Sequence, residues 1–172
     1  IMAGHGTVAL EMLAAEPDLD CIVVPIGGGG LIAGVATAAK HIKPDIKIIG
    51  VEVAAYPGTY DAIYGDNSYL GGSTIAEGIA VKKPGALPLK VIDHLVDNIL
   101  LVNEESIEEA INLLINIEKT VTEGAGASGL AAVMSNQEHF ANKKTALIIS
   151  GANIDSRILA SVLMRHLVKK GR

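Results

Sequence analysis

Four glycines in a row interrupt the stretch Val23-Val24-Pro25-Ile26-Gly27-Gly28-Gly29-Gly30-Leu31-Ile32-Ala33-Gly34, which joins a short apolar run to an alanine-rich segment. The apolar run is typical of a buried strand, and the segment after it is typical of a helix. Without β-carbons, a glycine backbone adopts positive φ and approaches a ligand closely, and its N–H groups join those of the following helix N-terminus around an anion. A tight strand-to-helix turn is the alternative, but it needs only one or two glycines. The stretch therefore predicts a phosphate-binding loop.

The composition favours a globular α/β domain. The chain has 172 residues, which suits one domain, and it is 49% hydrophobic with a mean hydropathy of +0.40. Aromatic residues make up only 3%, and small and aliphatic residues dominate, as in helices packed on a buried parallel sheet. The longest uncharged run, over residues 21–39, contains a proline and four consecutive glycines, and we do not expect it to span a membrane. With a net charge of −5 and no large basic cluster, the chain is not expected to bind nucleic acid.

The single cysteine, Cys21, lies at the start of an apolar run and excludes an intrachain disulfide. A lone buried thiol fits a reducing compartment, so we expect a cytoplasmic protein. The chain opens on Ile1 and has no charged segment followed by an apolar one, so it shows no secretory signal. We expect that it does not begin where its gene begins.

Strand and helix patterns alternate along most of the chain. We expect strands over residues 21–26, 47–53, 99–102 and 145–149, and helices over 6–15, 31–41, from 104 onward, after 124–127 and over 155–168. Asn103 is the expected N-cap of the helix that follows it. Residues 54–89 lack a regular pattern, and so long an irregular run is usually functional or packed against another element. The alternation predicts a three-layer αβα fold with an open, mostly parallel sheet.

Dinucleotide binding is the main alternative reading of the glycines. Gly28, Gly30 and Ala33 satisfy G-x-G-x-x-A between a strand and a helix, and Glu52 ends the next strand where a ribose would be bound. That fingerprint usually opens its fold, whereas here a helix precedes the first strand. Four glycines also exceed what the fingerprint requires. An NAD(P)-binding domain of a dehydrogenase therefore remains a second hypothesis, while a P-loop is excluded because no Lys-Ser or Lys-Thr follows the glycines.

Two further places could contribute to a site. Ser150 follows the last strand, and ligands of open α/β sheets bind at the carboxyl ends of the strands. Its hydroxyl could bond a ligand, but equally Ser150 or Asn153 could cap the next helix. Glu123 begins Glu123-Gly124-Ala125-Gly126-Ala127, whose small residues would let a helix end lie against a flat ligand. Glu123 could instead only complement the dipole of that helix.

Five motifs occur in order along the chain, and together they resemble the threonine dehydratase (threonine ammonia-lyase) and serine racemase family of fold-type II pyridoxal-phosphate enzymes. The resemblance covers essentially the whole chain. Two positions depart from the usual motifs, His5, where relatives commonly have Gln, and Ala152, where many have Gly. The motifs are Ile1-Met2-Ala3-Gly4-His5-Gly6-Thr7, Gly27 to Leu31, residues 74–85, Glu123-Gly124-Ala125-Gly126-Ala127 and Ser150-Gly151-Ala152-Asn153-Ile154-Asp155.

The resemblance implies roles for individual residues. Gly27, Gly28, Gly29 and Gly30 with Leu31 would hold the phosphate of pyridoxal 5'-phosphate, Ser150 would hydrogen-bond the pyridine nitrogen, and Glu123 would lie beside the cofactor. A neutral hydroxyl leaves that nitrogen largely unprotonated, which suits elimination at the β-carbon better than a long-lived carbanion. No metal is expected, because the histidines lack ligand spacing and Glu77 is expected to be a solvated loop carboxylate.

The family's Schiff-base lysine and its substrate-carboxylate loop lie in upstream motifs that do not occur in this chain. We therefore expect no catalytic residue here, and we interpret residues 1–172 as a single large-domain fragment without the lysine segment and without a downstream regulatory domain. The resemblance implies a threonine dehydratase that converts L-threonine to 2-oxobutanoate and ammonia, with serine to pyruvate as a second reaction. It further implies a role in isoleucine biosynthesis, a small amino-acid substrate and a homo-oligomer, dimer or tetramer. A non-catalytic assembly module is a third hypothesis.

Overall fold

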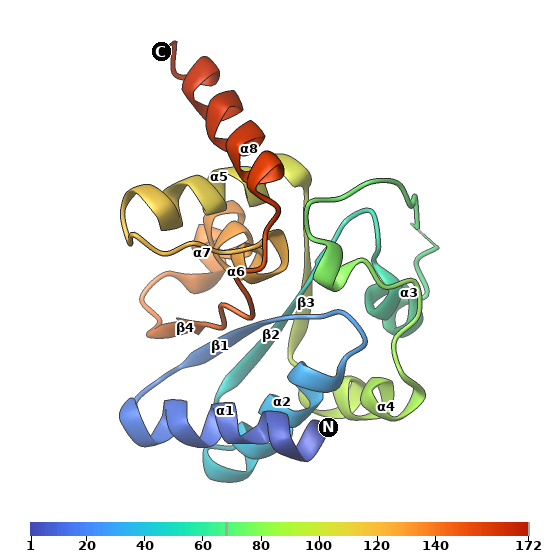
Figure 1. The fold of residues 1–172 in the computed structure, drawn as a ribbon. Coiled ribbons are helices and arrows are strands. Elements are labelled where there is room, and N and C mark those ends of the chain that lie inside the picture. The colour runs from blue at the N-terminus through green and yellow to red at the C-terminus, as the bar shows by residue number, and fades with distance from the viewer. Residues whose placement is uncertain (68, 172) are drawn as a thin grey trace.

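The computed structural model describes residues 1–67 and 69–171, and its centre is a sheet of four parallel strands in the order β3-β2-β1-β4 (Figure 1). The register pairs Cys21 of β1 with Lys47 of β2 on one side and with Thr145 of β4 on the other. The strands are β1 (Cys21–Pro25), β2 (Lys47–Val53), β3 (Asn98–Val102) and β4 (Thr145–Leu147).

Helices cover both faces of this sheet, with α1, α2 and α4 on one side and α5, α6 and α7 on the other (Figure 1). The predicted three-layer αβα fold is therefore confirmed. The helices are α1 (Met2–Ala15), α2 (Gly30–Ile42), α3 (Gly58–Tyr64), the 3₁₀ turn η1 (Glu77–Ile79), α4 (Ala86–Leu95), α5 (Glu104–Asn116), α6 (Gly124–Ser135), α7 (Gln137–Phe140) and α8 (Ser156–Lys169). Within the described residues, none of them combines the length and the apolar character that a membrane span requires.

The alternation of side chains along each strand builds two separate cores. Val23 of β1 packs with the buried residues of α5 and α6, whereas its neighbours Ile22 and Val24 pack with those of α1 and α2. Successive strand residues point to opposite faces, so a continuous apolar run serves both layers. This explains why the strands are mainly apolar and do not alternate regularly with polar residues.

The irregular segment 54–89 is more structured than its sequence indicates. It contains α3, η1 and the start of α4, so the expectation of a largely structureless run is wrong. Glu52 of β2 supplies the missing start signal for α3, because its carboxylate accepts hydrogen bonds from the backbone N–H groups of Thr59 (2.8 Å) and Tyr60 (2.9 Å). A residue outside the helix therefore satisfies the N–H groups that local sequence leaves unpaired.

Other boundaries shift by a few residues. The first helix begins at Met2, four residues before the expected start, and β4 ends at Leu147. The N–H of Ile148 still donates to the carbonyl of Val23 (3.1 Å), so the pairing with β1 continues past the end of the strand. Asn103 caps α5 as expected, since its side chain accepts from Ser106 N at 2.9 Å.

Candidate functional site

The strand order itself creates a crevice. From β1 the chain moves outward to β2 and β3 and then returns to place β4 on the other side of β1. In open α/β sheets such a switch point opens a ligand crevice at the carboxyl ends of the strands. The glycine loop leaves β1 at this edge, and Ser150 follows β4 at the same edge.

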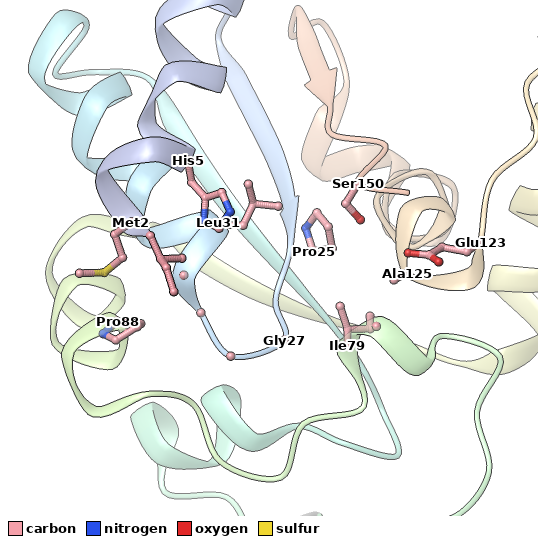
Figure 2. Close-up of a pocket in the computed structure, with 15 residues that line it drawn as sticks. Met2, His5, Pro25, Gly27, Leu31, Ile79, Pro88, Glu123, Ala125 and Ser150 are labelled. Carbon is pink, nitrogen blue, oxygen red and sulfur yellow. The ribbon is translucent and has the colours of Figure 1, made fainter. Parts of the chain in front are cut away.

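A cavity of about 690 Å³ lies at this position (Figure 2). All seven residues predicted as cofactor-binding candidates line it, although they come from three distant parts of the chain. The lining residues are Ile1, Met2, His5, Pro25, Gly27, Gly28, Gly29, Gly30, Leu31, Gly78, Ile79, Pro88, Glu123, Ala125 and Ser150.

The backbone of the glycine loop has unused hydrogen-bond donors. The N–H of Ile26 donates to the carbonyl of Val51, and the N–H of Ala33 donates to the carbonyl of Gly29. Between them, the N–H groups of residues 27–32 donate to no acceptor in the described part of the chain. Unpaired backbone donors next to a cavity at a helix N-terminus form an anion-binding arrangement.

Packing accounts for two of the four glycines. A Cβ at Gly27 would lie 2.8 Å from the carbonyl oxygen of Gly78, and a Cβ at Gly29 would lie 2.9 Å from the Cβ of Pro88. Gly29 also has φ +86°, a left-handed conformation that costs other residues free energy. The turn and its close contacts with the segment 77–88 therefore require glycine at these two positions.

Packing does not account for the other two glycines. A Cβ at Gly28 would meet no atom within 4 Å, and a Cβ at Gly30 would make only ordinary contacts with Ile1 (3.6 Å) and His5 (3.7 Å). Both residues line the cavity. Side chains at residues 28 and 30 would fit the fold but would occupy space beside the unpaired N–H groups. Glycine at these positions therefore keeps the N–H groups accessible from the cavity.

Ser150 is exposed at the cavity, and its hydroxyl has no protein partner among the described residues. The alternative that Ser150 or Asn153 caps the following helix is wrong, because Asp155 is the N-cap of α8. The Asp155 carboxylate accepts from Arg157 N at 2.8 Å. The Ser150 hydroxyl is thus available for a ligand.

Glu123 is the N-cap residue of α6 and is half-buried, and its side chain makes no capping hydrogen bond. Its backbone N–H donates to the carbonyl of Gly151 (3.1 Å), which holds the start of α6 beside the exit loop of β4. A Cβ at Gly151 would collide with the Glu123 carboxylate. Figure 2 shows Glu123 on the same side of the cavity as Ser150.

Packing explains the two glycines that follow Glu123 in its motif. A Cβ at Gly124 would collide with the backbone of Ile75, and a Cβ at Gly126 would collide with Thr122 and the backbone of Gly151. Of this motif, Glu123 and Ala125 line the cavity. Gly124 and Gly126 therefore permit close packing of α6 on its neighbours, and Ala125 is the small residue of the motif that lines the cavity.

Sequence reasoning missed several lining residues. Ile79 and Pro88 belong to the segment without a clear pattern, and Met2 and His5 come from α1, which precedes the first strand. The available signal was the resemblance itself, because Met2 and His5 lie in the motif Ile1 to Thr7 and Ile79 lies in the motif over residues 74–85. Among the described residues, no group of three or more His, Cys, Asp or Glu side chains is arranged to hold a metal ion.

Glu52 does not have the geometry that dinucleotide binding requires. Its side chain is 1% exposed, and both carboxylate oxygens accept backbone N–H groups of α3. Burial raises the pKa of the Glu52 carboxyl above its ordinary value, and the two hydrogen bonds oppose this shift. A carboxylate engaged in this way is not presented to a ribose, so the geometry offers no support for the NAD(P) hypothesis.

The site therefore defines an α/β domain with an anion-binding arrangement of backbone donors at the switch point of a parallel sheet. A family model described as "Pyridoxal-phosphate dependent enzyme" matches residues 1–151. The chain belongs to this family of pyridoxal-phosphate-dependent enzymes. The dehydrogenase hypothesis is not supported.

Individual relatives agree with the family assignment. The chain is 43% identical to the L-threonine ammonia-lyase of Thermotoga maritima, over 100% of this chain and 43% of that protein. It is 42% identical to the catabolic L-threonine dehydratase TdcB of Escherichia coli strain K12, over 90% of this chain and 48% of that protein. The structure of maize serine racemase superimposes with a TM-score of 0.83 at 35% identity, covering 99% of this chain and 54% of that one. The chain thus spans about half the length of the curated relatives it matches.

Proposed function

We propose that the protein carrying this chain is a pyridoxal-phosphate-dependent threonine ammonia-lyase, which converts L-threonine to 2-oxobutanoate and ammonia. Within it, this chain binds the phosphate and the ring of the cofactor. The observation that carries the proposal is the set of backbone N–H groups over residues 27–32 that remain unpaired at the switch-point cavity. The identities of 42–43% to proteins of this activity support the choice of substrate.

The room in the cavity and its unpaired donors support this assignment. Gly28 and Gly30 leave room for a phosphate against the unpaired N–H groups, and Leu31 continues the loop into the first turn of α2. Across the cavity, the Ser150 hydroxyl would bond the ring nitrogen and Glu123 would lie beside the ring. When bound, pyridoxal phosphate acts as an electron sink for the α-carbon of an amino acid. The residues of this chain hold and orient that group.

The lysine that holds the cofactor covalently is, in this proposal, supplied by a segment outside the 172 residues, as is the loop that binds the substrate carboxylate. We extend the proposal to L-serine as a second substrate that yields pyruvate.

We also propose that the protein is cytoplasmic, forms a dimer or tetramer, and supplies 2-oxobutanoate for isoleucine biosynthesis. Isoleucine-independent growth of a threonine ammonia-lyase-deficient strain carrying the full-length gene would support the last point, and failure of active protein to restore growth would contradict it.

The central experiment compares the full-length protein with the chain alone, each supplied with pyridoxal phosphate and L-threonine. We expect 2-oxobutanoate from the full-length protein and none from the chain. A full-length Gly28→Val variant tests the proposed phosphate site in the glycine loop, and we expect it to lose both bound cofactor and activity. Turnover by the chain alone would overturn the proposal that the lysine lies elsewhere, and an active Gly28→Val variant would overturn the proposed phosphate site.

A further inference from the structure

One side chain at the cavity has no role in the site described so far. His5 lies near the start of α1 and lines the cavity. A Cβ built on Gly30 would lie 3.7 Å from its Nδ1, so the ring is next to the glycine loop. Nδ1 is buried and has no hydrogen-bond partner among the described residues. Buried polar atoms are normally paired, so the unpaired Nδ1 bears on which nitrogen of the ring carries the proton.

The fold holds His5 in this place through two glycines. A Cβ at Gly34 of α2 would collide with the carbonyl of Met2 and lie 2.9 Å from the Cβ of His5. A Cβ at Gly6 would lie 3.3 Å from the carbonyl oxygen of Gly34. The backbones of α1 and α2 therefore cross closely at this point, and the crossing sets the imidazole against the start of α2. Figure 2 shows the ring extending from α1 toward Leu31 and the glycine loop.

The burial of Nδ1 determines which nitrogen of the neutral ring carries the proton. A proton on Nδ1 would leave a buried donor without an acceptor, whereas a proton on Nε2 leaves only a buried acceptor unpaired, which native proteins tolerate more often. Nε2 is not among the buried unpaired atoms and has no protein partner in the described chain. The neutral ring of His5, which lines the cavity, therefore has its N–H donor on Nε2 and not on the buried Nδ1.

The charge of the cavity makes an additional donor useful. Among the described residues that line the cavity, Glu123 alone is acidic, and none is a lysine or an arginine. An anion bound by the loop must therefore be held by neutral donors. We propose that His5 is a cofactor-positioning residue whose Nε2–H donates a hydrogen bond to the phosphate held by residues 27–31. This inference rests on the proposed function, and it adds a side-chain donor to the backbone N–H groups of the glycine loop.

Two substitutions at His5 separate this role from packing. His5→Phe keeps a planar ring and removes the donor, whereas His5→Gln keeps an amide donor and removes the ring. In the full-length holoenzyme we expect His5→Phe to weaken pyridoxal-phosphate affinity roughly 10- to 100-fold, because hydrogen bonds to charged groups are worth more than neutral ones. We expect His5→Gln to stay within about threefold of wild type. The ³¹P NMR resonance of the bound cofactor should move in His5→Phe and stay close to wild type in His5→Gln.

His41→Phe is the matched control, since His41 lies on the exposed side of α2 away from the cavity, and we expect unchanged affinity and an unchanged resonance. The inference is overturned if His5→Phe binds pyridoxal phosphate with wild-type affinity, whether or not His5→Gln loses that affinity. Should His5→Phe fail to fold, loss of affinity in a folded His5→Gln variant still overturns it. Gly28→Val in the same assay tests the loop itself. If Gly28→Val loses cofactor affinity while His5→Phe keeps it, only the role of His5 is rejected. If Gly28→Val keeps wild-type affinity, the phosphate site on which this inference rests is rejected.

Discussion

At the scale of single residues, the four glycines of the loop have different tasks although they are identical in sequence. Gly27 and Gly29 allow close contacts with the segment 77–88, and Gly29 also has a positive φ. Gly28 and Gly30 keep space open beside unpaired backbone donors. The distinction depends on where each absent Cβ would point, which follows from the path of the loop in the folded chain.

This division predicts opposite effects for two substitutions. Gly29→Ala should destabilise the fold by about 1–3 kcal/mol, because it adds a left-handed alanine and a contact with Pro88. Gly28→Val should leave the free energy of unfolding within about 0.5 kcal/mol, since its Cβ meets no neighbour, yet it should abolish cofactor binding. Urea unfolding and cofactor titration of both variants measure the two effects. A Gly28→Val variant that unfolds as easily as Gly29→Ala would show that the fold also depends on Gly28.

Glu52 predicts a pH dependence of stability. Its folded pKa is raised by burial above the value of 4.5 for an exposed glutamate, so the unfolded chain loses this proton first as the pH rises. The contribution of Glu52 to stability is therefore fully present below about pH 4.5 and is lost as the pH rises through the raised folded pKa.

Unfolding of wild type and Glu52→Gln from pH 4 to pH 8 tests this sign, because glutamine does not titrate. The difference in free energy of unfolding, wild type minus variant, should fall as the pH rises. A difference that grows with pH would mean that the two hydrogen bonds from α3 outweigh burial and lower the folded pKa.

At the scale of elements, the crossing of α1 and α2 sets one wall of the cavity. Gly34→Ala should destabilise the protein by about 1–3 kcal/mol, because the new Cβ would collide with the backbone of α1 at Met2. Gly4→Ala is the matched control, since it lies in α1 with no atom within 4 Å of its Cβ. Alanine there should stabilise the helix by up to about 1 kcal/mol. Thermal or urea unfolding distinguishes the two, and equal effects would contradict the close crossing.

The elements that sequence patterns located correctly are those whose signals are local. The strands around Val23 and Ile49 are continuous apolar runs, and Asn103 carries its capping signal in its own side chain. Helix α3 was missed because its N-terminal N–H groups are satisfied by Glu52, a residue of the preceding strand. Helix α4 was missed because its packing depends on Ile92, which is buried in the core shared with α1 and α2.

At the scale of the whole molecule, the cavity joins segments from both ends of the chain. Its lining runs from the first residues of α1 to Ser150, through the loop after β1, the segment 77–88 and the start of α6. A ligand that contacts all of these stabilises the folded chain as a unit, by about 2.7 kcal/mol at 100 times its dissociation constant.

We therefore expect pyridoxal phosphate to raise the unfolding midpoint of the chain. Inorganic phosphate should have a smaller effect of the same sign, because it engages the glycine loop but not Ser150. NAD should have none, since Glu52 is held by α3. Differential scanning fluorimetry with each ligand measures these shifts. A shift with NAD equal to that with pyridoxal phosphate would contradict the assignment of the cavity.

The sequence by itself determined the layers, the parallel sheet, the glycine loop after β1 and the family resemblance, because periodicity, capping and glycine runs act over a few neighbouring residues. The tertiary structure decided which of those residues meet. Placing β4 beside β1 brings Ser150 and Glu123 to the loop at residues 27–30, more than 90 positions earlier in the chain. The close crossing of α1 and α2 adds His5 to the same cavity. Neither contact has a local signal, because each depends on the order of strands and on how closely two backbones approach.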